Sequence, residues 1–252
     1  MSITTENESG QGRVAVVTGG SRGIGNQVAR KLAADGLAVV VVYGGNQAAA
    51  EVTVKEIREA GGQAIAAQAD IADENDMAAV FDLAEQTFGG IDVVVNAAGR
   101  MVLSTLADLD LKVLDEMHRT NIRGTFVVSQ QALRRLRSGG TLINFSSSVV
   151  GLAFPRYSGY AASKGAVEAM TLILAREMRG RDITVNVVAP GPTATDLLFD
   201  NNTEENLGRL ASAPPLERLG TAEDITEVVA FLVSPEGHWV NGQVIRANGG
   251  AI

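Results

Sequence analysis

Cysteine is absent from the 252-residue sequence, and histidine occurs only twice. Without cysteine there is no disulfide bond, no thiolate nucleophile and no zinc site with sulfur ligands, so a reducing cytoplasm is the expected compartment. The two histidines, His118 and His238, lie far apart and match no metal-ligand spacing. We therefore expect ordinary imidazole side chains at both positions and no bound metal.

Basic residues are also outnumbered. The chain has 21 Lys and Arg against 29 Asp and Glu, which gives a net charge of −8 at pH 7. Nucleic-acid binding needs clustered Lys and Arg to contact phosphates, so this balance argues against a nucleic-acid partner. It also gives no help in attracting an acidic carrier protein. A small, neutral substrate fits the charge better.

Long apolar runs are missing as well. No run approaches the 18 apolar residues that cross a bilayer, and the first residues are acidic and polar where a secretory signal is basic and then apolar. We expect neither export nor a membrane partner. Residues 1–11 are polar and without periodicity, so we expect a flexible tail there.

The sequence instead has a regular alternation of short apolar runs and helical patterns, within an apolar fraction of 46%. The run of four valines at 39–42 is typical of a parallel strand buried on both faces. The expected strands are 13–17, 37–43, 63–68, 91–95, 141–145, 183–188 and 243–246, and the expected helices follow residue 25 and cover 48–60, 73–88, 111–136, 157–178 and 222–233. This order predicts a single α/β domain over residues 12–252. No repeat or low-complexity linker divides it.

A glycine-rich turn follows the first expected strand. Gly19, Gly23 and Gly25 precede apolar residues at helical spacing. Glycines in such a turn let backbone amides approach a pyrophosphate at the positive end of a helix. The spacing G-x-x-x-G-x-G differs from the G-x-G-x-x-G dinucleotide fingerprint, so on this motif alone a purely structural turn is an equally good interpretation.

The second expected strand ends without a carboxylate. An NAD site usually carries an Asp or Glu about 20 residues past the glycines, where it binds the ribose 2′-hydroxyl. Here the strand ends in Tyr43, Gly44, Gly45 and Asn46, and Arg22 in the glycine turn offers a cation for a 2′-phosphate. The alternative for Arg22 is a solvated loop arginine. Both features favour NADP(H) over NAD(H).

The third and fourth expected strands end in polar or small residues. Ligands gather at the carboxyl ends of the strands in open α/β sheets, which places Asp70 near an adenine amino group. Helix capping by Asp70 or Asp73 explains these carboxylates equally well. The fourth strand leads into Asn96 and then Ala97, Ala98 and Gly99, whose small side chains leave room for a cofactor to lie across the sheet.

Tyr160 and Lys164 are four residues apart in an expected helix and therefore share one face. A neighbouring cation stabilises a phenolate and lowers the tyrosine pKa from ~10 toward the range of an acid or base that works near neutrality. The preceding strand ends in Ser146, Ser147 and Ser148, whose hydroxyls could donate to a carbonyl oxygen.

Asn121 falls in the middle of the expected helix 111–136, among apolar residues. Its amide competes with the backbone there and requires partners if it is buried. Either a satisfied structural asparagine or a functional one accounts for this position.

Together these motifs resemble the short-chain dehydrogenase/reductase family. The resemblance runs from Arg13 to the C-terminus and is carried by Thr18-Gly19-x-x-x-Gly23-Ile24-Gly25, Asn96-Ala97-Ala98-Gly99, Asn121, Ser147, Tyr160-x-x-x-Lys164 and Pro190-Gly191. Ala97 departs from the asparagine commoner in the family. The resemblance implies a single-domain, doubly wound Rossmann fold with a seven-stranded parallel sheet. It also implies hydride transfer between NADP(H) and a carbonyl or secondary alcohol, with a ketone or 3-oxoacyl substrate favoured.

The resemblance also implies a catalytic tetrad of Asn121, Ser147, Tyr160 and Lys164, in which the family's spacing to the tyrosine selects Ser147 among the three serines. Tyr160 would protonate the nascent alkoxide, and Lys164 would lower its pKa and hold the nicotinamide ribose. Ser147 would donate to the substrate oxygen, and Asn121 would fix a water that links Lys164 to solvent.

The remaining site residues follow from the resemblance and from chain position. The expected cofactor contacts are Gly19, Ser21, Arg22, Gly23, Ile24, Gly25, Tyr43, Gly44, Asn46, Asp70, Ile71, Asn96, Ala97, Ala98, Gly99, Tyr160, Lys164, Pro190, Gly191, Thr193 and Thr195. Thr193 is the better partner for the nicotinamide carboxamide, and Thr195 the weaker. The expected substrate pocket consists of Ser147, Val149, Phe154, Tyr157, Leu197, Leu198 and Phe199, with Met101 at its floor. Residues 193–212 are expected to form a mobile lid.

Two other functions stay open. One is an NAD-dependent dehydrogenase of a secondary alcohol, sugar or polyol, and the other is a catalytically silent dinucleotide-binding sensor. Recognition of an acyl carrier protein would need a basic patch at the cleft mouth, which Arg134, Arg135 and Arg137 could supply if they are not simply solvated. The resemblance further implies a homotetramer, with the helices that begin at Leu111 and Tyr157 at one interface and the C-terminal segment at another.

Overall fold

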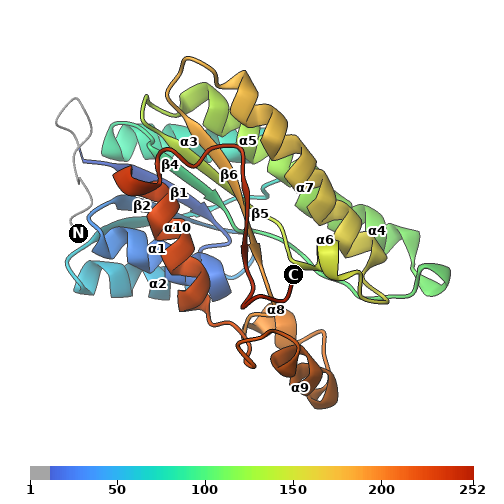
Figure 1. The fold of residues 1–252 in the computed structure, drawn as a ribbon. Coiled ribbons are helices and arrows are strands. Elements are labelled where there is room, and N and C mark those ends of the chain that lie inside the picture. The colour runs from blue at the N-terminus through green and yellow to red at the C-terminus, as the bar shows by residue number, and fades with distance from the viewer. Residues whose placement is uncertain (1–11) are drawn as a thin grey trace.

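Seven parallel strands form one sheet in the computed structural model, which describes residues 12–252 (Figure 1). The strands are β1 (Val14–Thr18), β2 (Ala38–Tyr43), β3 (Gln63–Gln68), β4 (Val93–Asn96), β5 (Thr141–Phe145), β6 (Thr184–Pro190) and β7 (Val244–Ala247). Their order is β3-β2-β1-β4-β5-β6-β7, so β1 lies between β2 and β4 and the strand order reverses there. Ligands bind at such switch points in open α/β sheets. The doubly wound fold class is confirmed, whereas the expected tail lies outside the described residues.

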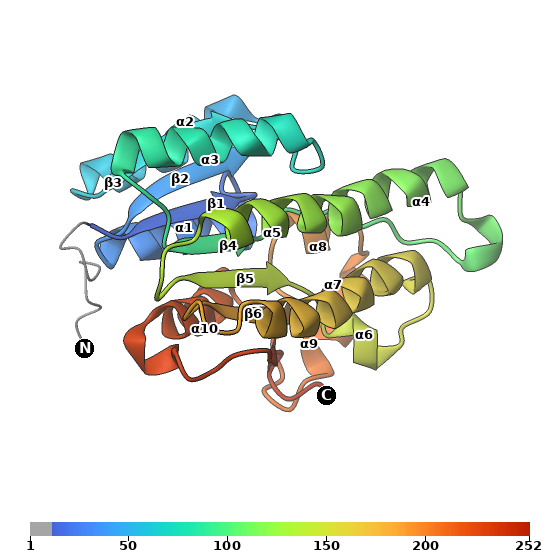
Figure 2. The same ribbon diagram turned by 90° about the horizontal axis from the view of Figure 1, so that it is seen from above.

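Helices cover both faces of the sheet. One layer contains α1 (Gly23–Ala34), α2 (Gln47–Glu59) and α10 (Ala222–Val233), and the other contains α3 (Glu74–Phe88), α5 (Gly124–Arg135) and α7 (Ser158–Glu177). Figure 2 shows the second layer with α3, α5 and α7 side by side. Each layer closes a separate hydrophobic core against the sheet.

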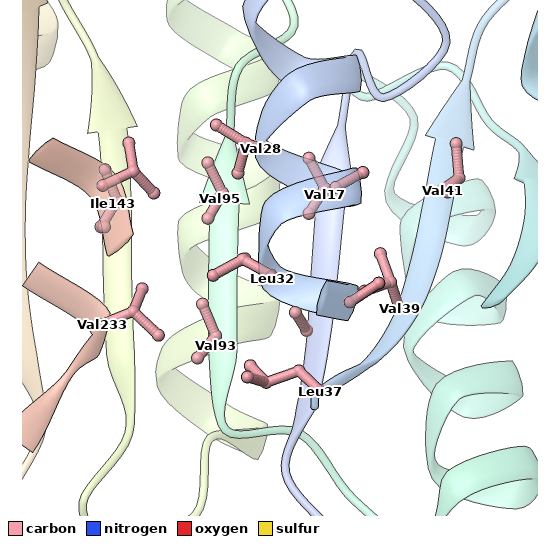
Figure 3. Close-up of a cluster of buried hydrophobic side chains, with 14 of the residues drawn as sticks. Val17, Val28, Leu32, Leu37, Val39, Val41, Val93, Val95, Ile143 and Val233 are labelled. Carbon is pink, nitrogen blue, oxygen red and sulfur yellow. The ribbon is translucent and has the colours of Figure 1, made fainter. Parts of the chain in front are cut away.

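Branched apolar side chains fill the core under α1. Val28 and Leu32 of α1 lie against Val17 and Val95, which project from β1 and β4 (Figure 3). All four are at most 1% exposed. The other face of the same strands packs against the layer of α3, α5 and α7. Because both faces of these strands are buried, their sequences are continuous apolar runs and do not alternate between apolar and polar residues.

The long helix expected over 111–136 is interrupted. The structure has α4 (Leu111–His118), a π-helical turn η2 (Arg119–Arg123) and then α5. Asn121 lies in this turn, and Thr125 Oγ1 donates to its backbone oxygen at 2.7 Å. π-turns are rare and concentrate at functional sites. The unfavourable asparagine in an apolar helix therefore marked a real irregularity of the backbone.

Several short elements were not predicted. They are α6 (Val149–Leu152), α8 (Asp196–Phe199), α9 (Glu204–Ser212) and the 3-10 turns η1 (Leu106–Asp108) and η3 (Pro235–Gly237). Apart from α9, these segments have three or four residues and are too short to show helical periodicity. The expected lid thus contains α8 and α9, which lie together below the helical layers in Figure 1.

Asp73 and Asp224 take part in helix caps. Asp73 Oδ1 accepts hydrogen bonds from Asn75 N and Asp76 N, so Asp73 is the cap of α3. Thr221 caps α10 in a reciprocal capping box with Asp224.

Within residues 12–252, no helix combines the length and apolar character needed to cross a bilayer.

A buried carboxylate joins the amino ends of the central strands. Asp92, which is 3% exposed, accepts hydrogen bonds from Val14 N at 2.7 Å and Arg137 Nε at 2.9 Å. Val14 begins β1, and Arg137 belongs to the connection from α5 to β5. Removing one member of a buried pair leaves the other charge uncompensated.

We expect Asp92→Ala to lower the free energy of unfolding by about 3–5 kcal/mol, measured by urea denaturation. Asp82→Ala is the matched control, because Asp82 pairs with Arg135 at 2.5 Å on the surface, where its side chain is 55% exposed. The control should cost less than about 1 kcal/mol. Equal losses in the two variants would contradict the structural role of Asp92.

Candidate functional site

Two adjoining clefts open at the carboxyl edge of the sheet. The glycine-turn cleft is lined by the turn after β1 and by the ends of β2, β3 and β4. The tyrosine cleft is lined by the loop after β5, the start of α7, the end of β6 and the segment that carries α8 and α9. Residues of both linings are Ile24, Ala97, Gly99, Thr195 and Leu197. One extended ligand can therefore reach from one cleft into the other.

The glycine turn has a shape that only glycine permits. A Cβ on Gly25 would lie 2.3 Å from the backbone oxygen of Gly19, closer than any real contact. Gly19 itself has φ +66° and packs against the backbone of Ala98. These close approaches bring the start of α1 up to the end of the sheet. Its unpaired backbone N–H groups and positive dipole end thus face the cleft.

Arg22 precedes α1 and lines the same cleft. Its side chain is exposed and makes no hydrogen bond or ion pair with any of residues 12–252. Across the cleft, β2 ends in Tyr43, Gly44 and Asn46, which contribute no carboxylate. The cation is free to bind an anionic group at this end of the cleft.

Asp70 lines the glycine-turn cleft after β3. Its carboxylate accepts hydrogen bonds from Ala72 N at 2.9 Å and Arg119 Nη1 at 2.5 Å. Burial alone would raise the pKa of Asp70, but the hydrogen bonds from Ala72 and Arg119 outweigh it and hold the pKa below its usual value. Asp70 is therefore an ionised acceptor, as an amino-group contact requires.

Tyr160 and Lys164 both project from α7 into the tyrosine cleft. They are 8% and 6% exposed, and Lys164 Nζ lies 5.7 Å from the centre of the Tyr160 ring. Nζ also donates to the backbone oxygen of Phe145 at 2.9 Å, which ties α7 to the end of β5. The spacing in the sequence therefore brought the two side chains together as expected.

Burial dominates the ionisation of this pair. It raises the pKa of Tyr160 to about 12, although a hydrogen bond with Ser147 pulls in the opposite direction. It lowers the pKa of Lys164 to about 8. The expected lowering of the Tyr160 pKa by Lys164 is contradicted for the protein alone, because desolvation of the phenol is the largest effect on its pKa. Tyr160 is a protonated phenol at neutral pH, the state of a proton donor.

The structure distinguishes the three serines after β5. Ser146 Oγ donates to Glu168 Oε1 at 2.7 Å, and Ser148 Oγ donates to Ala189 O at 3.2 Å. Ser147 lines the tyrosine cleft together with Tyr160, and it is the serine that lowers the pKa of the phenol against the effect of burial. Two hydroxyls, those of Ser147 and Tyr160, thus converge on one point of the cleft, where they can contact the same substrate oxygen.

Asn121 clamps the loop after β4 to α7. Its Oδ1 accepts from Arg100 N at 2.9 Å, and its Nδ2 donates to Arg100 O at 2.9 Å and Ser163 Oγ at 3.0 Å. A Cβ on Gly99 would lie 3.4 Å from Asn121 Oδ1 and 3.5 Å from Lys164 Nζ, so the loop after β4 passes beside both side chains. Both amide hydrogens are used within the protein. A water here could bind only through acceptor atoms of Asn121.

Most of the expected lining residues lie on one of the two clefts. The tyrosine cleft contains Met101, Val149, Phe154, Tyr157, Pro190, Gly191, Thr193, Thr195, Leu197 and Leu198, and the glycine-turn cleft contains Ser21, Gly23, Ile24, Ile71, Ala97 and Ala98. Thr193 Oγ1 already donates to Gly191 O at 2.9 Å.

Phe199 and Asn96 are the exceptions. Phe199 is 46% exposed and lines neither cleft, because burial of Leu198 on the short helix α8 turns the next side chain outward. Asn96 is 2% exposed and faces the interior, where it bonds to Thr18, Thr125 and Asn144. Both assignments are therefore corrected.

Leu152 and Leu210 line the tyrosine cleft and were missed. Leu152 ends the four-residue helix α6, which has no sequence signal. Leu210 is the single buried residue of α9, whose polar and acidic composition resembles that of a loop. The apolar residue on an otherwise polar segment was the one available clue.

The two histidines and the three arginines take no part in either cleft. His118 Nε2 contacts Gly159 O at 3.2 Å, and His238 pairs with Asp182 at 2.8 Å. No cluster of potential metal ligands occurs within residues 12–252.

Arg134, Arg135 and Arg137 lie at the end of α5 and just before β5, at the edge of the sheet opposite the clefts. Arg135 pairs with Glu85, and Arg137 with Asp92. They therefore form no basic patch at the cleft mouth.

Comparison with known proteins places the chain among reductases and dehydrogenases. A family model described as enoyl-(acyl carrier protein) reductase matches residues 19–251. A short-chain type dehydrogenase/reductase of Picea abies is 45% identical over 96% of this chain and 93% of its own. An NADPH-dependent aldehyde reductase-like chloroplastic protein of Arabidopsis thaliana is 40% identical over 96% and 94%.

Among solved structures, a short chain dehydrogenase from Burkholderia cenocepacia J2315 in complex with NADP superposes with a TM-score of 0.90. It is 40% identical to this chain, and the match covers 96% of this chain and 98% of the other.

The depressed pKa of Lys164 predicts a pH-dependent stability. Below pH 8 the Lys164 ammonium is charged in both the folded and the unfolded protein, and the full cost of burying its charge is present. Between pH 8 and about 10.5 the unfolded chain binds the extra proton, so stability rises with pH. We expect the unfolding free energy of the wild type, relative to Lys164→Met, to rise by about 2 kcal/mol between pH 7 and pH 10.

Urea denaturation of the cofactor-free proteins at the two pH values measures this difference. Tyr160 is present in both proteins, so the onset of its ionisation largely cancels. Methionine leaves Phe145 O without its donor, but that cost is independent of pH. A difference that stays constant with pH would show that burial of Lys164 does not lower its pKa.

Proposed function

The chain is an oxidoreductase that belongs to the short-chain dehydrogenase/reductase family, and we propose that it is an NADPH-dependent carbonyl reductase acting on a neutral, apolar ketone or aldehyde. The observation that carries the proposal is the convergence of the Tyr160 and Ser147 hydroxyls beside Lys164, in a cleft continuous with the glycine-turn cleft. The reaction needs a hydride donor, a proton donor and an oriented carbonyl in one place.

The glycine-turn cleft has residues that suit a dinucleotide. Gly19 and Gly25 let a pyrophosphate approach the start of α1, and Asp70 is an ionised acceptor suited to an adenine amino group. Arg22 has no partner within residues 12–252 and would bind a 2′-phosphate, while β2 ends without the carboxylate that prefers a 2′-hydroxyl. The NADP in the Burkholderia structure and the NADPH dependence in the name of the Arabidopsis relative support this preference.

Tyr160 is the proton donor in the proposed reduction. NADPH, held by the glycine turn and Arg22, would supply a hydride for the carbonyl carbon. Ser147 and Tyr160 hold the substrate oxygen by two hydrogen bonds, and the phenol transfers its proton to that oxygen as it gains negative charge. Because burial raises the pKa of Tyr160 to about 12, the group reaches this step protonated.

Lys164 compensates the phenolate that the proton transfer creates. Its Nζ stays fixed to Phe145 O, and the buried cation lies 5.7 Å from the Tyr160 ring centre. Asn121 keeps the loop after β4 against α7, and so holds the Lys164 surroundings in place. In the reverse direction the same phenolate would accept the alcohol proton.

The chemistry of the tyrosine cleft favours a neutral substrate. Its walls are Met101, Val149, Leu152, Phe154, Leu197, Leu198 and Leu210, and Lys164, whose Nζ is already bonded, is the charged residue of the lining. Apart from Lys164, no described residue of this lining is a cation that could bind a carboxylate or a phosphate. Although the description of the matching family names an acyl carrier protein, the arginines that could dock one lie at the opposite edge of the sheet.

Three further properties are part of the proposal. Residues 193–212 act as a substrate lid, since Leu198 and Leu210 of this segment cover the tyrosine cleft. The chain assembles as a homotetramer through α5 and α7, which lie side by side and expose Phe126, Leu172 and Ile173. The lack of cysteine favours the cytoplasm.

We expect Tyr160→Phe to lower kcat at least about a thousandfold, because the substrate oxygen loses its proton donor. NADPH binding, followed by fluorescence titration, should change less than about threefold. Tyr157→Phe is the control for loss of a phenol in the same cleft, and it should keep at least about a tenth of the wild-type kcat. Near-normal turnover by Tyr160→Phe would remove the proposed mechanism, and no turnover of any carbonyl compound by the wild type would favour the sensor.

We expect Arg22→Ala to raise the KM for NADPH about 10- to 100-fold while the KM for NADH stays within about twofold, because one charge-assisted contact to the 2′-phosphate is lost. Arg30→Ala is the control, since Arg30 lies on α1, the helix that Arg22 precedes, and pairs with Glu56 at 3.2 Å, away from the cleft. Initial rates with both cofactors measure the effect. A wild type that prefers NADH would favour the NAD-dependent alternative.

A further inference from the structure

The residue after the last strand is hydrogen-bonded to the loop after β5, which carries Ser146, Ser147 and Ser148. Asn248 follows β7, and its Nδ2 donates to Ser148 Oγ at 3.0 Å, across 100 residues of chain. Ser148 is 1% exposed, and its hydroxyl donates onward to Ala189 O at 3.2 Å. Asn248 thereby connects the edge strand β7 with the loop after β5 and with the end of β6.

The same residue organises its own turn. Asn248 Oδ1 accepts from Gly250 N at 3.0 Å, so the two atoms of the amide have different partners. A Cβ on Gly191 would lie 2.8 Å from Cα of Asn248, which shows how closely this turn approaches the end of β6. The side chain is therefore fixed in position before it contacts Ser148.

The C-terminal segment continues this contact as far as α6. A Cβ on Gly151 would lie 2.5 Å from Cδ1 of Ile252, and both ribbon views place the C-terminus close to α6 (Figures 1 and 2). Val149 and Leu152 of α6 line the tyrosine cleft. The loop that carries Ser147 is thus supported along its outer side by the last residues of the chain.

We propose that Asn248 is a positioning residue, which orients Ser147 and α6 toward the tyrosine cleft through its hydrogen bond to Ser148. Ser147 lies between the anchored Ser148 and the end of β5, and its Oγ accepts from Val149 N at 3.3 Å. Ser148 N also donates to Pro190 O at 2.9 Å, so loss of the Asn248 contact removes one of the bonds that hold the peptide which sets the direction of the Ser147 side chain. Displacements of about 1 Å in such groups lower rates by up to about a hundredfold. The consequence for turnover rests on the proposed function.

The test distinguishes the role of the Asn248 amide nitrogen from that of the amide oxygen. Asn248→Asp keeps an acceptor for Gly250 N but loses the donor to Ser148. Asn241→Asp is the matched control, because Asn241 Oδ1 likewise accepts a backbone N–H, that of Val185 at 2.9 Å, at the far end of the same pair of strands. Hydrogen–deuterium exchange of peptides that cover 146–152 is expected to be about tenfold faster in Asn248→Asp and unchanged in Asn241→Asp. Unchanged exchange in both would overturn the proposal, whether or not the protein is active.

Turnover provides the second measurement. We expect Asn248→Asp to lower kcat about tenfold with the KM for NADPH within about twofold, and Asn241→Asp to keep its kcat. The double variant with Ser148→Ala should be no slower than the slower single variant, because both changes break one hydrogen bond. Multiplicative losses would show that Asn248 acts by another route.

Two further outcomes are distinguished from the exchange and turnover results described above. If Asn248→Asp fails to fold, Asn248→Ser, which keeps a short hydroxyl for the turn, takes its place in both measurements. If the wild type reduces no carbonyl compound, the proposed function fails, and the exchange experiment alone decides the role of Asn248.

Discussion

The buried ammonium of Lys164 is the constraint on which the site depends. A charge in this position is costly unless its donors have fixed partners, and the structure provides the backbone oxygen of Phe145 at the end of β5. That contact sets the position of α7 relative to the sheet, and with it the position of Tyr160. The backbone of Gly99 lies close to both Lys164 Nζ and Asn121 Oδ1. A helix, a loop and a strand end are thus held together around one cation.

The parallel sheet explains why residues so distant in sequence meet there. Every strand delivers its following loop to the same edge, so the ends of β1 to β4 form one cleft and those of β5 and β6 the other. The strand order reverses beside β1, which leaves the helices diverging and the edge open at this point. The fold therefore determines where the chemistry can occur, and the loops determine which chemistry it is.

Sequence reasoning succeeded where a physical requirement is local. The valine run of β2 and the helical spacing of Tyr160 and Lys164 depend on nearest neighbours and were predicted correctly. The π-turn at Asn121 was visible only as a misfit, because its cause is the contact with Arg100 and Ser163 in space. The direction of the Tyr160 pKa was wrong for a similar reason, since desolvation depends on what covers the phenol. No spacing in the sequence reports that.

The two clefts have different roles in the proposed function: the glycine-turn cleft binds the cofactor, and the tyrosine cleft selects the substrate. The glycine-turn cleft is built from backbone, a buried strand end and Arg22, which has no partner among the described residues, and all of these leave clear marks in the sequence. The tyrosine cleft is closed by short helices whose apolar residues show no period, as Leu152, Leu198 and Leu210 illustrate. Such segments can change their side chains without disturbing the sheet, because no strand pairs with them. Substrate preference therefore resides in the part of the chain that sequence patterns describe least, while the cofactor and the reaction are set by the part they describe best.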